Sequence, residues 1–97
     1  MMLQPHESEL VGRWELKNGQ AIADATTRRI KWLTENSLVE LGSDSTGWDV
    51  LYVDRRDGRL WELTNLQSDS HGGGPPRLAL LDPKRAQEKY GRIAIDP

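Results

Sequence analysis

The segment 48–66 constrains the fold most, because two apolar runs lie on either side of a turn sequence at 55–58. The turn allows a two-residue loop, which would pair Val53 with Glu62, or a three-residue loop that ends at Gly58. A slip of one residue moves every side chain to the opposite face of a sheet. Only the three-residue loop places apolar residues opposite one another, so we predict it, with Gly58 in the left-handed conformation. The predicted cross-strand pairs are Val53 with Trp61 and Leu51 with Leu63.

A second hairpin is predicted near the beginning of the chain. Residues 10–17 alternate between apolar and polar side chains, which is typical of a half-buried strand. Asn18-Gly19 follows, and this pair is the strongest signal for a two-residue turn because both residues tolerate positive φ. Gln20–Ala23 is the return strand, with Leu16 opposite Ala21. The residues predicted to face inward are Leu10, Gly12, Trp14 and Leu16.

Two helices are indicated by their capping residues. Asp24 can cap a helix over about 24–35 that ends at Asn36. Asp82 before Pro83 predicts a second helix over 83–90. The fold class is therefore α+β, a small single domain over residues 1–97 with a mainly antiparallel sheet. The remaining strands are predicted at 37–42, with Val39 and Leu41 inward, at 77–81, and at 92–95.

The core must be small, because Leu, Ile and Val total 21 of 97 residues and Phe is absent. Aromatic side chains cover roughly 150–250 Å² each, so the tryptophans must supply much of the burial. Trp14 and Trp61 occupy inward strand positions and are predicted in the core, with Trp32 at its edge. Trp48 is predicted to pack under a loop; the alternative is an exposed contact residue.

Composition also excludes several functions. The net charge is −2 without a basic stripe, which argues against binding of nucleic acid. No apolar run exceeds four residues, so a membrane helix is not expected, and the first ten residues do not resemble a signal peptide. Cysteine is absent, which removes disulfides and thiolate chemistry. We expect a cytoplasmic protein; its oligomeric state stays open.

No catalytic or metal motif emerges. His6 and His71 are the only histidines, and with nearby aspartates they match no known metal-ligand spacing. Ser68–His71 contains the residue types of a hydrolytic triad, but adjacent in sequence rather than brought together from different elements. We therefore expect no catalytic residue and no metal site.

The loop 72–76, Gly-Gly-Gly-Pro-Pro, joins the most permissive backbone to the stiffest. No lysine-serine pair and no helix follow it, so a phosphate-binding loop is not indicated. Two interpretations stay open. The loop is either a turn that allows close approach to another strand, or a surface loop preorganised for a partner. We predict that it packs against the sheet and holds His71 at an edge.

The sequence resembles the immunity protein 27 family of bacterial polymorphic toxin systems over roughly residues 7–91. The resemblance rests on the ordered combination of several short motifs rather than on one of them. These motifs are Glu9-Leu10-Val11-Gly12-Arg13-Trp14, Asp24 with Arg29-Ile30, Gly47-Trp48-Asp49, Asp57-Gly58-Arg59-Leu60-Trp61-Glu62-Leu63, His71-Gly72-Gly73-Gly74-Pro75-Pro76, and Tyr90.

The resemblance implies a non-enzymatic cytoplasmic protein that binds and neutralises a cognate secreted toxin domain, one to one, in competition between bacteria. It implies no cofactor, and the charge balance and short apolar runs predict neither nucleic acid nor a membrane as partner. The alternatives are a small adaptor or structural subunit of a larger complex and, more remotely, a hydrolase that uses His71. The hairpin end and the His71 loop offer charged groups on short turns, which makes them candidate contacts for the toxin. The alternative is that these charges only pair with one another around the turn. The candidate partner-binding residues are Trp48, Asp54, Arg56, Asp57, Arg59 and His71, and the motif residues with a structural role are Gly58, Trp61, Gly72, Gly73, Gly74, Pro75 and Pro76.

Overall fold

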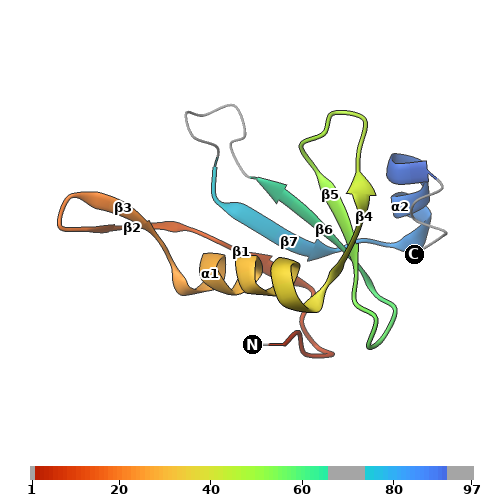
Figure 1. Ribbon diagram of the computed structural model, residues 1–97, viewed down its shortest axis with the longest axis horizontal. Helices are drawn as coiled ribbons and strands as arrows, with labels where there is room; N and C mark the ends of the chain where they lie inside the picture. Colours follow the sequence, from red (N-terminus) through yellow and green to blue (C-terminus); the bar gives the residue numbers. More distant parts are fainter. Residues whose placement is uncertain (1, 66–73, 92–97) are drawn as a thin grey trace.

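The computed structural model describes residues 2–65 and 74–91. They form a five-stranded antiparallel sheet in the order β1-β7-β6-β5-β4, a separate two-stranded ribbon, β2–β3, and two α-helices (Figure 1). This confirms the predicted α+β class. The elements are β1 (Glu9–Val11), β2 (Trp14–Lys17), β3 (Gln20–Ala23), α1 (Ala25–Trp32) with its π-helical continuation η1 (Leu33–Ser37), β4 (Val39–Ser43), β5 (Val50–Val53), β6 (Leu60–Asn65), β7 (Pro76–Leu80) and α2 (Pro83–Tyr90).

Both faces of the five-stranded sheet are covered, so the domain has two small apolar clusters. On one face, α1 and η1 contribute Ile30, Leu33 and the following Leu38. On the other face, α2 contributes Ala86 and Tyr90. Trp61 is fully buried, which confirms its predicted place in the core. The sheet residues of the first cluster are Leu10, Tyr52, Trp61 and Leu78, and those of the second are Leu51, Val53 and Leu60.

The predicted register of the β5–β6 hairpin is wrong by one residue. Val53 pairs with Leu60 and Tyr52 with Trp61, so the loop spans 55–58 and is one residue longer than predicted. The prediction assumed that only one face of these strands is buried. Because helices cover both faces, Leu51, Tyr52 and Val53 are all buried, and apolar alternation does not select the register. Gly58 does have positive φ, +77°, as predicted.

The predicted first strand, 10–17, is divided between the two sheets. β1 pairs with β7, whereas β2 pairs with β3 across Asn18-Gly19, which has the two predicted positive φ values. The division falls at Gly12, whose N–H donates to the carbonyl of Pro76 at 2.8 Å. A side chain at Gly12 would collide with Thr27 and Pro76, so only glycine lets the chain pass this close to Pro76 as it leaves the sheet for the ribbon. Leu16 pairs with Ala21, as predicted.

Several side chains predicted to be inward are exposed. Trp14 is 49% exposed and Leu16 is 80% exposed, because no second layer covers the β2–β3 ribbon. Trp48 is 65% exposed, so its predicted packing under a loop is wrong and the alternative, an exposed side chain, is correct. Val39 is exposed on the edge strand β4. Trp32 lies at the edge of the first cluster, as predicted.

The capping predictions hold for both helices. Asp24 accepts the N–H of Thr27 at 2.7 Å, and Asp82 accepts the N–H of Lys84 at 2.8 Å. Asn36 does not end the first helix; it lies within η1, and the chain becomes extended at Leu38. The strand predicted at 77–81 is β7, shifted by one residue. The strand predicted at 92–95 lies outside the described residues.

Substitution of Gly58 by valine should lower the free energy of unfolding by more than about 1 kcal/mol, because a β-branched residue resists the left-handed conformation. A Cβ at this position would meet no atom within 4 Å, so the cost is conformational rather than steric. Gly58→Asn is the matched control and should cost less, since asparagine tolerates this conformation. Urea denaturation measures both; equal stability of the valine variant and the wild type would contradict the assignment.

Candidate functional site

The end of the β5–β6 hairpin is organised around a buried carboxylate. Asp54 directly follows β5 and has no exposed surface. Its Oδ1 accepts the backbone N–H of Arg56 at 3.0 Å and Nε of the same residue at 3.2 Å, and its Oδ2 accepts Nη2 at 3.0 Å. A buried charge is tolerated only when it is paired and hydrogen-bonded in this way. The first charged residues of the turn sequence Asp-Arg-Arg-Asp-Gly-Arg therefore stabilise the hairpin itself.

Two arginines of this hairpin end also bind the N-terminal segment, residues 2–8. Arg56 donates from Nη2 to the carbonyl of Leu3 at 2.7 Å. Arg59 donates to three further carbonyls, of Gln4 at 3.2 Å, Pro5 at 3.3 Å and Glu7 at 3.0 Å. These bonds hold the side chain of Leu3 in the first apolar cluster. The N-terminal segment is thus part of the fold.

A third arginine secures the same segment from the helix side. Arg29 on α1 donates to both oxygens of Glu7 at 2.7 Å and to the carbonyl of Met2 at 2.9 Å. The hydrogen bonds from Arg29 lower the pKa of Glu7 to about 2. This bidentate geometry is the strongest form of a carboxylate–guanidinium pair. The helix and the hairpin therefore bind the N-terminal segment between them.

Asp57 and Arg59 form the outward part of the hairpin end. Asp57 accepts the backbone N–H of Arg59 at 3.0 Å and Nε at 2.6 Å. The backbone N–H and then the guanidinium of Arg59 lower the pKa of Asp57. The same guanidinium lies 5.2 Å from the ring centroid of Trp61, within the range of a cation–π contact. Arg59 is therefore fixed from three sides while Asp57 stays exposed.

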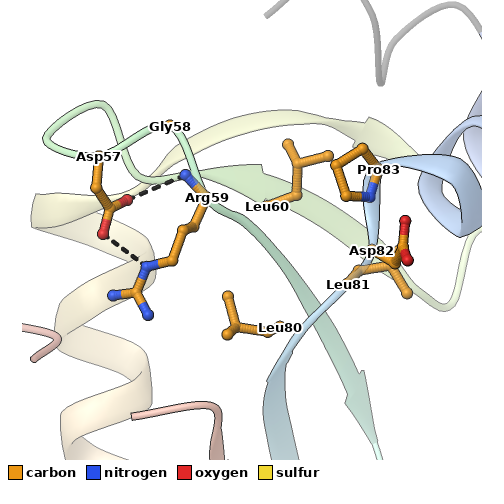
Figure 2. A pocket seen from close by; sticks show the side chains of 8 residues that line it. All are labelled: Asp57, Gly58, Arg59, Leu60, Leu80, Leu81, Asp82 and Pro83. Carbon is orange, nitrogen blue, oxygen red and sulfur yellow. Dashed lines mark hydrogen bonds and ion pairs between the residues drawn. The ribbon is translucent and has the colours of Figure 1, made fainter. Parts of the chain in front are cut away.

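A hollow of about 390 Å³ lies beside this hairpin end. Figure 2 shows the Asp57–Arg59 pair on one side of it and the chain from Leu81 to Pro83, which leads from β7 into α2, on the other. Its floor is apolar and its edge carries charge, a combination suited to an inserted side chain of a partner. The hollow is lined by Asp57, Gly58, Arg59, Leu60, Leu80, Leu81, Asp82 and Pro83.

The structure brings only part of the predicted site together. Asp54, Arg56, Asp57 and Arg59 share the hairpin end, but Asp54 is buried and makes its contacts inside the domain. Trp48 lies on the β4–β5 loop, at the opposite end of β5. Of the structural motif, Gly74 is buried and accepts a hydrogen bond from the Asn65 side chain at 3.1 Å, and Pro76 opens β7, where proline is tolerated. His71, Gly72 and Gly73 lie outside the described residues, and so does the predicted position of His71 at an edge of the sheet. Pro75 lies just before β7.

Sequence reasoning missed two groups of residues. The first is the N-terminal segment, for which the only signal was the apolar Leu3 just before the polar residues 4–9. The second joins α2 to the sheet: Lys89 contacts Asp49 and Glu62, both at 2.6 Å, and the hydroxyl of Tyr90 donates to Glu62 at 2.7 Å. Burial and then Glu62 raise the pKa of Tyr90, so this hydroxyl stays protonated and can donate.

Within residues 2–65 and 74–91, no group of three or more histidine, aspartate and glutamate side chains could hold a metal ion. In the same part of the chain, no helix is long and apolar enough to cross a membrane. Two surface features stand out among the described residues: the hairpin end with its hollow, and the exposed apolar side chains.

The family model of Immunity protein 27 matches residues 16–82, which is more than half of the chain. The match includes the hairpin end and most of the sheet but not the N-terminal segment that the arginines bind. No curated protein and no solved structure matches the chain.

Truncation of Asp54 and of Asp57 should distinguish a carboxylate that stabilises the fold from one that only lies on the surface. Asp54→Ala removes the acceptor of three hydrogen bonds and should destabilise the domain by roughly 2–3 kcal/mol. Asp57→Ala, the matched control on the same turn, removes a solvent-exposed pair and should cost less than about 1 kcal/mol. Chemical denaturation of both variants measures the difference; similar losses would contradict the assignment of Asp54 as the anchor.

The Glu7–Arg29 pair should make stability depend on acid pH. The pKa of Glu7 falls from 4.5 to about 2 on folding, so its contribution is present above 4.5 and is lost as the pH falls toward 2. Glu7→Gln should therefore be less stable than the wild type at neutral pH, with a difference that shrinks between pH 4.5 and 2. Urea titrations across this range test the sign; a difference that grows toward low pH would contradict it.

Proposed function

This chain belongs to the immunity protein 27 family, and from this premise we propose that it binds and neutralises a cognate secreted toxin domain. The proposed mode of action is a stoichiometric complex, one immunity protein to one toxin domain, formed in the cytoplasm of the producing cell and its kin. The protein would act through affinity and not through turnover. The family match carries this proposal, and the hairpin end supplies its chemistry.

The hairpin end has the properties of a recognition surface. The side chain of Arg56 is 45% exposed and that of Asp57 is 37% exposed. Asp57 and Arg59 line a hollow with an apolar floor, so charge and shape occur together at this end of the hairpin. Arginine is enriched in interfaces because its planar donors bind carboxylates and carbonyls specifically. We propose Arg56, Asp57 and Arg59 as toxin contacts here, and Trp48 as a contact at the other end of β5; His71 stays a candidate from sequence.

The rigid support of this surface favours tight binding. Asp54 fixes Arg56, and Trp61 with the N-terminal carbonyls fixes Arg59. Side chains that are already ordered lose little conformational entropy when a partner binds. Asp54 would thus contribute indirectly, by positioning Arg56. A specific interface takes roughly 800 Å² from each partner, which is a large part of so small a domain.

Growth rescue tests the function. The product of the adjacent gene is expressed in a susceptible bacterium with and without this chain, and colony counts are compared. We expect growth only when both are present, and a 1:1 complex by light scattering after co-purification. An adaptor of a larger assembly would not rescue growth, and a catalytic inhibitor would protect at far less than equimolar levels; either result would contradict the proposal.

The hairpin-end contact is tested by charge reversal at a position that contributes little to the fold. Asp57→Lys should weaken binding of the toxin domain at least roughly tenfold, the change expected when an interfacial charge is reversed. Glu88→Lys, on the exposed side of α2, makes the same change in net charge and should leave affinity unchanged. Circular dichroism confirms folding of both. Unchanged affinity in Asp57→Lys would exclude this residue as a contact without affecting the proposed function.

A further inference from the structure

The β2–β3 ribbon projects from the body of the domain (Figure 1). Trp14 pairs with Ala23 and Leu16 with Ala21, so these four apolar side chains lie on one face of the ribbon. No second layer covers that face: Leu16 is 80% exposed and Trp14 is 49% exposed. We call this ribbon, residues 14–23, the arm.

The arm has a defined shape although its apolar face is uncovered. Its turn, Asn18-Gly19, has the two positive φ values of a tight hairpin. Its base is tied to α1, because the N–H of Asp24 donates to the carbonyl of Arg13 at 3.1 Å and Arg28 donates to the carbonyl of Ala23 at 2.7 Å. A two-stranded ribbon alone is marginally stable in water, so these bonds keep the arm ordered.

The apolar face continues into a second hollow, of about 340 Å³, at the base of the arm. Trp14 forms one wall of it, and Ile30, Leu63 and Pro76 contribute apolar surface from α1 and the sheet. An exposed leucine and tryptophan that lead into an apolar hollow form a connected patch rather than scattered apolar residues. Such patches on a small domain mark surfaces that a protein partner covers.

The charges around this patch indicate which kind of partner fits. Residues 13–31 contain five basic and two acidic side chains, although the whole chain has a net charge of −2. Among the described residues, no carboxylate forms an ion pair with Arg13, Lys17 or Lys31, and Lys31 lines the hollow. Lys17 projects from the opposite face of the arm to Leu16, whereas Lys31 borders the hollow. The complementary surface is therefore an apolar side chain with carboxylates beside it that face Lys31, on a partner attracted by the positive charge of the arm as a whole.

We propose that the apolar face of the arm and the hollow at its base bind the toxin domain through an acidic surface with an apolar centre. This inference rests on the proposed function and adds a surface separate from the hairpin end. Leu16 and Trp14 supply the apolar contact, and the unpaired cations orient the toxin and accelerate its association.

The apolar contact is tested with Leu16→Ser, which removes a mostly exposed side chain, and Trp14→Ala, which removes a half-exposed one. Val39→Ser on the edge strand β4 is the matched control. Affinity for the toxin domain encoded by the adjacent gene is measured by titration calorimetry, and growth rescue is scored in parallel. We expect both arm variants to fold, to lose roughly 30-fold or more in affinity and to protect poorly. Val39→Ser should bind and protect as the wild type does.

The electrostatic contribution is tested with the double variant Lys17→Glu and Lys31→Glu, against Lys84→Glu with Arg85→Glu, which changes the net charge equally on α2. The arm variant should associate with the toxin domain at least roughly tenfold more slowly at low salt, and the difference should shrink at high salt. Equal association rates for the two double variants would contradict an acidic partner surface.

The outcomes distinguish the two proposals. If the wild type binds the toxin and protects, but Leu16→Ser and Trp14→Ala do so equally well, the arm is not the binding surface and the function stands. If the wild type neither binds nor protects, both proposals fall together. If light scattering shows a wild-type dimer that Leu16→Ser converts to a monomer, the arm is an interface between two copies, and its assignment to the toxin is wrong.

Discussion

The carboxylate of Asp54 is the contact on which most of this small domain depends. It ends β5, closes the turn through the N–H of Arg56, and orients the guanidinium of that residue toward the carbonyl of Leu3. A buried carboxylate without these donors would be costly to desolvate, so the turn, Arg56 and the carbonyl of Leu3 support one another. The hairpin end can serve as a rigid surface because its charged groups already form hydrogen bonds and ion pairs inside the domain.

Ionic contacts supplement a core that is small on both faces of the sheet. The two clusters contain few large side chains, and Trp61 fills much of the first one. Each peripheral part is therefore held by charged groups as well: the N-terminal segment by Arg29, Arg56 and Arg59, and α2 by the contacts of Lys89 and Tyr90 with Glu62. Charge-assisted bonds of this kind provide orientation where apolar burial is limited.

Local signals in the sequence predicted local structure well. Asp24, Asp82 and Asn18-Gly19 each act through neighbouring backbone groups, so their roles follow from the residue and its immediate context. Features that depend on distant elements were not accessible in this way. Alternation predicted β2 as a strand but could not show that its apolar face is uncovered, and it failed for β5 because both faces are buried. The same limit applies to the candidate site: the turn charges were evident, whereas their binding of residues 3–7 joins parts of the chain more than fifty positions apart.

The hydrogen bonds from Arg56 and Arg59 to the N-terminal segment all end on carbonyl oxygens of the backbone. Every residue type presents the same carbonyl, so the anchoring does not depend on which side chains follow Leu3 until Glu7. Gln4, Pro5 and His6 are exposed and can be exchanged during evolution while the path of the chain is kept. Related proteins can therefore diverge at this end without losing the fold. Comparison of sequences would then miss this segment, because apart from Leu3 and Glu7 its attachment depends on the arginine side chains and not on its own.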